Sequence, residues 1–110
     1  MKTKSTTAYK KWEIVLLPFP FNSTTTEKKR PGLIVSPEEF NKGKSVIILQ
    51  ISSNIDLTDK MVYEIKNWKD ARLFGPSVIR MKFATIDKNI ISKKIGKLSQ
   101  EDIDIFKNYL

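Results

Sequence analysis

The 110-residue sequence contains no cysteine and no histidine. The missing cysteine excludes disulfide bonds and thiol chemistry, and it suits a protein of the reducing cytoplasm. The missing histidine excludes Ser-His-Asp and Cys-His catalytic schemes. Without either residue, a zinc site lacks its usual sulfur and nitrogen ligands. An enzyme of this composition therefore has to work with Arg, Lys, Ser, Thr and carboxylate side chains.

Long apolar runs, glycine-rich segments and acidic clusters are missing as well. The longest apolar runs, such as Ile14 to Leu17, are far shorter than the roughly 18 residues that a membrane-spanning helix needs. The glycines are isolated, which excludes a glycine-rich loop around phosphate groups. Scattered acidic residues argue against a carboxylate magnesium site: Asp56, Asp59, Glu64, Asp70 and Asp87. We therefore expect no metal ion, no organic cofactor and no membrane segment.

What the sequence has in excess is positive charge. Twenty Lys and Arg residues against twelve Asp and Glu residues give a net charge of +8 and an isoelectric point near 9.7. The basic residues recur at 10–11, 28–30, 80–82 and 93–94. A small excess would be explained by solubility, but an excess of this size favours a polyanionic partner.

The apolar pattern predicts a mainly β fold in a single domain. Six short segments are typical of strands: residues 12–17, 33–35, 45–51, 61–65, 77–85 and 90–95. The β-branched run over 45–51 predicts burial on both faces, whereas 61–65 alternates. Six strands in this length indicate a small, strongly curved sheet or barrel. Residues 1–11 are polar and lack the apolar core of a secretory signal, so we interpret them as a flexible tail before a domain over 12–110.

A helix is predicted at the C-terminus. Ser99 and Asp102 stand at the spacing of a capping box, with Asp in place of Glu. Ile103, Phe106 and Leu110 then fall on one helical face. The sequence therefore predicts a helix that closes one side of the sheet.

The available residue types suit cleavage of RNA by its own 2′-hydroxyl. The substrate then supplies the nucleophile, and the protein supplies positive charge, hydrogen-bond donors and proton transfer. Arg30 is the strongest candidate, because Pro31 holds it in an extended conformation from which its planar guanidinium can bind a phosphate. Lys28 and Lys29 precede it. A solvated basic turn is the alternative for these three cations.

Polar and aromatic residues supply further candidates. Gln50, Ser52 and Ser53 end the most buried predicted strand, where they can hold a substrate oxygen or simply terminate the strand. Phe19 and Phe21 flank a proline near the basic loop, so they are better candidates for base stacking than the tryptophans, which a small core needs.

The chain resembles the MazF/PemK toxin family. Six segments in order carry the resemblance: 13–21, 29–36, 50–53, 75–80, 85–88 and 94–99, that is EIVLLPFPF, KRPGLIVS, QISS, GPSVIR, TIDK and KIGKLS. The resemblance implies the SH3-like barrel that this family shares with CcdB. It implies a metal-independent endoribonuclease that cleaves single-stranded mRNA and leaves a cyclic 2′,3′-phosphate and a 5′-hydroxyl. It also implies a homodimer with RNA along the dimer groove, and an acidic antitoxin that occupies that groove.

Some site residues follow from the same resemblance. The arginine before proline matches Arg30, the strand-end threonine matches Ser52, and the arginine after Pro-Ser-Val matches Arg80. Arg30 would stabilise the phosphate charge and Ser52 would hydrogen-bond the phosphorane. The RNA backbone would be held by Arg80, Lys28, Lys29 and Lys82. An acidic residue that follows the arginine in some members is replaced by Met81 and Lys82. Because arginine is a poor base, Glu27 is the candidate for proton transfer.

Two other functions fit the same sequence. A CcdB-like toxin that binds a protein target such as DNA gyrase would leave the Arg30 site dispensable. An inactive RNA-binding member of the fold would keep the basic surface and lack the acid and base.

Overall fold

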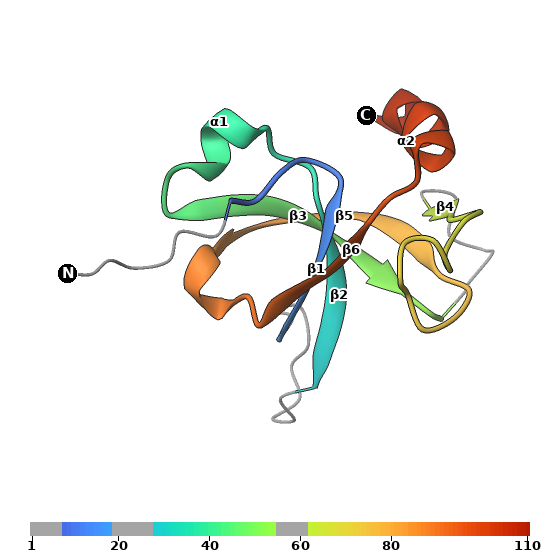
Figure 1. Ribbon diagram of the computed structural model, residues 1–110, viewed down its shortest axis with the longest axis horizontal. Coiled ribbons are helices and arrows are strands. Elements are labelled where there is room, and N and C mark those ends of the chain that lie inside the picture. The colour runs from blue at the N-terminus through green and yellow to red at the C-terminus, as the bar shows by residue number, and fades with distance from the viewer. Residues whose placement is uncertain (1–7, 19–27, 55–61) are drawn as a thin grey trace.

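The computed structural model describes residues 8–18, 28–54 and 62–110 (Figure 1). Its six strands form one antiparallel sheet in the order β4-β5-β3-β2-β1-β6. The strands are β1 (Glu13–Pro18), β2 (Lys29–Ile34), β3 (Ser45–Ser52), β4 (Val62–Glu64), β5 (Val78–Asp87) and β6 (Lys93–Lys97). The helix α2 (Gln100–Phe106) follows and ends in the 3-10 turn η2 (Lys107–Tyr109). The predicted mainly β fold with a C-terminal helix is confirmed. In the described part of the chain the edge strands β4 and β6 do not pair, so the barrel is not fully closed.

Some element boundaries differ from the prediction. β2 begins at Lys29, before the Pro31-Gly32 pair that we expected to precede it. Pro31 pairs with Leu16 of β1, and its missing N–H costs the sheet at most one hydrogen bond. The last strand begins only at Lys93, because the carboxylate of Asp87 accepts a hydrogen bond from the Asn89 N–H at 2.8 Å and caps the 3-10 turn η1 (Lys88–Ile90).

A short helix that the sequence did not predict, α1 (Glu38–Asn41), lies between β2 and β3. Its buried Asn41 accepts a hydrogen bond from the Ser36 hydroxyl and donates one to the Tyr9 carbonyl at 2.9 Å. These contacts attach residues 8–12 to the domain. A flexible tail was expected over residues 1–11. Tyr9 in its last part is bonded to Asn41, and residues 1–7 lie outside the described residues.

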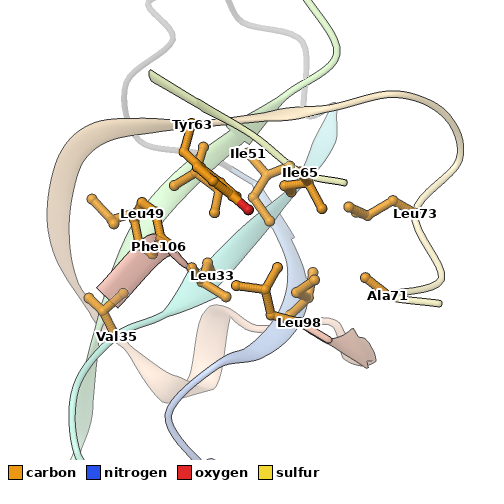
Figure 2. Close-up of a cluster of buried hydrophobic side chains, with 12 residues drawn as sticks. Leu33, Val35, Leu49, Ile51, Tyr63, Ile65, Ala71, Leu73, Leu98 and Phe106 are labelled. Carbon is orange, nitrogen blue, oxygen red and sulfur yellow. The ribbon is translucent and has the colours of Figure 1, made fainter. Parts of the chain in front are cut away.

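The sheet is buried on both faces. On one face, residues of five strands pack with α2 into the first core: Ile14, Leu33, Val35, Leu49, Ile51, Tyr63, Ile65, Ala71, Leu73, Ile79, Leu98 and Phe106 (Figure 2). The other face carries a smaller core of Val15, Leu17, Ile34, Val46, Ile48 and Ile86. β3 contributes alternate residues to both cores, which confirms the prediction that this strand is buried on both sides.

The carboxylate of Asp102 joins α2 to the segment after β4. Asp102 is fully buried and accepts hydrogen bonds from the Tyr63 hydroxyl at 2.5 Å and from the N–H groups of Lys66 and Asn67, each at 2.9 Å. Ser99 caps the helix as predicted, with its hydroxyl oxygen 3.1 Å from the Asp102 N–H. Burial by itself would raise the pKa of Asp102, but the hydrogen bonds to the carboxylate outweigh it and lower that pKa below its ordinary value of 3.8. Burial and the bond to Asp102 raise the pKa of Tyr63.

We expect Asp102→Ala to lower the free energy of unfolding by roughly 3 kcal/mol, because it leaves buried donors without an acceptor. The lowered pKa means that the carboxylate stabilises the fold above its ordinary pKa of 3.8 and that this contribution disappears as the pH falls through the folded value. Urea unfolding at a series of pH values measures both effects. The variant should lose less stability than the parent protein on acidification.

Asp104→Ala is the matched control, since Asp104 lies on the same helix but is exposed and pairs with Gln100 and Lys107. Equal destabilisation by the two variants would contradict the role assigned to Asp102.

Candidate active site

The ends of β2 and β3 and the segment before β5 enclose a pocket of about 190 Å³. We call it the Arg30 pocket. Its lining residues come from three stretches of the chain: Lys28, Lys29, Arg30, Pro31, Ile51, Ser52, Ser53, Leu73, Phe74, Gly75 and Ser77. The predicted residues Arg30 and Ser52 are therefore brought together. In Figure 1 the segment between β4 and β5 folds beside the end of the β3 arrow.

Strand register explains why Arg30 and Ser52 meet. Gly32 of β2 pairs with Gln50 of β3, and the antiparallel ladder continued by two residues sets Arg30 opposite Ser52. Side chains alternate along a strand, so Gln50 and Ser52 lie on the same face of β3 as Ile48 of the smaller core. That face therefore changes from apolar to polar along its length, and the pocket lies at its polar end.

Arg30 is the dominant charge of the pocket. Its guanidinium Nε is buried and finds no hydrogen-bond partner in the described part of the chain. Buried donors in proteins are nearly always paired, so this N–H is available to an acceptor that a ligand brings. Lys28 and Lys29 add two exposed cations, and no described lining residue is acidic. The pocket is thus suited to a phosphate or another anion.

Ser52 begins a turn that is held from the neighbouring strand. Its hydroxyl oxygen accepts a hydrogen bond from the Asn54 N–H at 3.0 Å, and the Arg80 guanidinium donates to the Asn54 carbonyl at 3.1 Å. The sequence left two interpretations of Ser52, a strand-ending turn residue or a site residue. The serine takes part in a turn and also lines the pocket. Its own O–H is still able to donate to a substrate oxygen.

The remaining predicted residues are distributed as follows. Ser53 lines the pocket, and Gln50 pairs with Arg80 in the sheet. Lys82 is exposed on β5, where the register with β3 shifts between Leu49 and Gln50 and leaves Met81 and Lys82 without a partner in that ladder. Phe19, Phe21 and Glu27 lie outside the described residues.

The tryptophans pack as core residues, as expected. Both are partly buried against the first core. Trp12 also meets Phe106 edge to face, with ring centroids 6.2 Å apart.

The pocket residues that precede β5 were not predicted from the sequence. Phe74 is the most prominent, because its side chain is 86% exposed at the edge of the pocket. The sequence did contain a signal for this wall. Phe74 is an aromatic residue directly before Gly75-Pro76, in a segment with no strand or helix pattern. Ser77 is buried and donates to the Gly75 carbonyl at 2.9 Å, which shapes this wall.

Comparison with known proteins agrees with this architecture. An endoribonuclease in complex with its cognate antitoxin, from a mycobacterial species, has a similar structure with a TM-score of 0.73 and 11% identity, over 94% of this chain and 90% of that one. The Mycobacterium tuberculosis toxin MazF-mt6 gives a TM-score of 0.70 and 18% identity, over 88% of this chain and 90% of that one. At these identities the likeness shows the fold. No curated protein sequence matches.

Two further observations bear on the class of protein. No helix in the described residues is long and apolar enough to cross a membrane. The sequence profile of the PemK-like, MazF-like toxins of type II toxin–antitoxin systems matches residues 10–110, nearly the whole chain. The chain therefore belongs to the PemK-like, MazF-like toxin family of type II toxin–antitoxin systems.

Proposed function

We propose that this toxin is a metal-independent endoribonuclease that cleaves single-stranded mRNA at the Arg30 pocket. The observation that carries the proposal is the buried, unpaired Nε of Arg30 in a cationic pocket beside the Ser52 hydroxyl. A phosphate oxygen is the acceptor that such a donor set fits best. Family membership supports the same activity.

In the proposed reaction the 2′-hydroxyl oxygen of the substrate attacks the adjacent phosphorus. The O2′–P bond forms while the bond from phosphorus to the 5′-oxygen breaks, which gives a cyclic 2′,3′-phosphate. The 2′-hydroxyl loses its proton, and the leaving 5′-oxygen gains one and becomes a 5′-hydroxyl. Arg30 and Ser52 stabilise the negative charge on the phosphorane oxygens, where preorganised donors have their largest effect. Glu27 remains the proposed proton acceptor.

The surrounding cations bind the backbone of the RNA. Lys28 and Lys29 lie at the pocket and Lys82 on β5, all exposed. Arg80 holds the turn after Ser52 through Asn54, so we assign it a positioning role in addition to RNA contact. Phe19, Phe21, Gln50 and Ser53 complete the proposed RNA-binding set.

The first test concerns the chemistry. Neither histidine nor cysteine is present to hold a metal, and the proposed nucleophile belongs to the substrate. We therefore expect equal cleavage rates in excess EDTA and in magnesium, measured on a mixed-sequence RNA. A 2′-O-methyl group at the scissile position should abolish cleavage at that position. Cleavage of DNA or of the methylated RNA would rule out this mechanism.

The second test separates catalysis from binding. Arg30→Ala should lower the cleavage rate of bound RNA at least ~100-fold, the effect of losing one preorganised oxyanion donor. Ser52→Ala should also impair cleavage, whereas Ser52→Thr keeps the hydroxyl and should be tolerated. Single-turnover kinetics with saturating protein measure the bound-state rate.

Lys28→Ala and Lys29→Ala are the matched controls for this test. They should weaken RNA binding and lower its salt dependence, because each removes a backbone contact, while the bound-state rate stays close to that of the parent protein. Full activity of Arg30→Ala would contradict the proposed site and favour a protein target such as gyrase.

The third test concerns assembly. We propose a homodimer neutralised by an acidic antitoxin; the net charge of +8 supports an acidic partner, and so does the solved complex of a related fold. Sedimentation should give a dimer, and an acidic antitoxin peptide should compete with RNA. A monomer that cleaves RNA at the full rate would show that dimerisation is unnecessary.

A further inference from the structure

The proposed reaction removes a proton from the 2′-hydroxyl of the RNA, and the Arg30 pocket has no acidic residue among its described lining residues. Glu27, the candidate from the sequence, lies outside the described residues. A proton acceptor has to come within hydrogen-bond reach of that hydroxyl, directly or through one water molecule. A carboxylate that serves this purpose therefore has to stand on the sheet surface next to the pocket.

Strand register sets Glu64 in line with Arg30 and Ser52. Ser52 of β3 pairs with Val78 of β5, and Val78 pairs in turn with Glu64 of β4. On β2 the continued ladder sets Arg30 opposite Ser52. Directly paired residues of neighbouring strands point to the same face of a sheet. One row across four strands therefore carries Arg30, Ser52, Val78 and Glu64 on a single face.

The spacing along this row suits a proton transfer to a bound nucleotide. Two strand spacings, about 10 Å, separate the Cα atoms of Ser52 and Glu64. The glutamate side chain extends into this interval from one end, and the ribose next to a phosphate at Ser52 extends into it from the other. Val78 between them is buried and apolar, so its side chain competes for neither the proton nor the phosphate.

The Glu64 carboxylate is also available. Its side chain is exposed, and within the part of the chain that the structure describes it takes part in no ion pair or side-chain hydrogen bond. It lines a hollow of about 280 Å³ that shares Ser77 with the Arg30 pocket. The carboxylate therefore faces open space beside the proposed phosphate position.

The other acidic residues in the described ranges stand elsewhere. Glu13 lies at the opposite end of β1 from the pocket and pairs with Lys94 at 3.3 Å. The oxygens of Asp102 are buried and hydrogen-bonded. The rest lie on α1, after β4, at the end of β5 or on α2: Glu38, Glu39, Asp70, Asp87, Glu101 and Asp104. Glu64 is thus the described acid in the row of Arg30 and Ser52.

We propose that Glu64 is a further catalytic residue, which accepts the proton of the 2′-hydroxyl. The inference rests on the proposed function and adds to Glu27 a second carboxylate that is able to take this proton. As the O2′–P bond forms and the bond from phosphorus to the 5′-oxygen breaks, a carboxylate oxygen of Glu64 takes the proton. The leaving 5′-oxygen receives a proton from solvent water, and Glu64 later returns its own to solvent.

The test removes the carboxylate and then supplies one from solution. Glu64→Ala should lower the single-turnover cleavage rate at least ~100-fold, the lower end of the range for general base catalysis. Added formate should restore part of that rate, because a small carboxylate in the vacated space accepts the same proton. Binding of a fully 2′-O-methylated RNA should not weaken, since the variant loses a negative charge.

A second substrate identifies which proton Glu64 handles. In an RNA with sulfur in place of the scissile 5′-oxygen, the leaving group needs no proton. Glu64→Ala should remain as slow relative to the parent protein on this substrate as on ordinary RNA. Recovery of the parent rate would show that Glu64 acts on the leaving group, which contradicts the proposal.

Asp70→Ala is the matched control, because it removes an exposed carboxylate that lies after β4 and outside the row. It should cleave at the parent rate with and without formate. Unchanged melting temperatures of both variants should show that they fold.

Four further results would overturn the inference. If Glu64→Ala cleaved at the parent rate, the inference would fail and the proposed function would stand. A slow Glu64→Ala that formate did not restore would make Glu64 a structural residue. If formate restored Glu27→Ala but not Glu64→Ala, Glu27 would be the acceptor. If the parent protein cleaved no RNA, the inference and the proposed function would both fail.

Discussion

The structure depends on one buried carboxylate. Among the described residues Asp102 is the charged side chain with no exposed surface, and its oxygens gather donors from Tyr63, Lys66, Asn67 and Ser99. These four hydrogen bonds offset the cost of burying the charge. The helix α2 covers the first core, and the same carboxylate fixes the segment that leads from β4 toward the Arg30 pocket. The interaction that closes the core therefore also positions one wall of the site.

The Arg30 pocket lies where one face of β2 and β3 changes from apolar to polar residues, and Ile51 and Leu73 of the first core also line it. Val46 and Ile48 of β3 belong to the smaller core, and Gln50 and Ser52 continue the same alternation. On β2 the sequence runs from the buried Ile34 through Gly32 to Arg30. The Arg30 guanidinium and the Ser52 hydroxyl are therefore both carried by strands, β2 and β3, and lie at the same end of the sheet. Positions fixed in this way lose little entropy when a phosphate binds.

Sequence patterns predicted the parts of this structure that depend on neighbouring residues. The β-branched run of β3 and the Ser99 cap are visible within a few residues, and both were predicted correctly. That Arg30 and Ser52 belong to one site followed from family resemblance, since no local pattern sets the register between β2 and β3. Three of the four partners of Asp102 are 35 to 39 residues away in the sequence, and the wall around Phe74 comes from a segment without periodicity. Such contacts arise from tertiary packing, which a local pattern does not encode.

One glycine has a consequence for how mutational surveys of this toxin are interpreted. Gly96 of β6 lies against the loop of Ala71, so closely that a Cβ atom would stand 2.2 Å from the Ala71 carbonyl oxygen. The two nearest atoms, the carbonyl oxygen and carbon of Ala71, are backbone, so no side-chain rotation relieves the clash. Selection for cells that survive the toxin would therefore recover substitutions at Gly96 as readily as substitutions in the Arg30 pocket. Intolerance at Gly96, which does not line the pocket, then results from the close approach of two backbones, and counting it as a site residue would enlarge the apparent site.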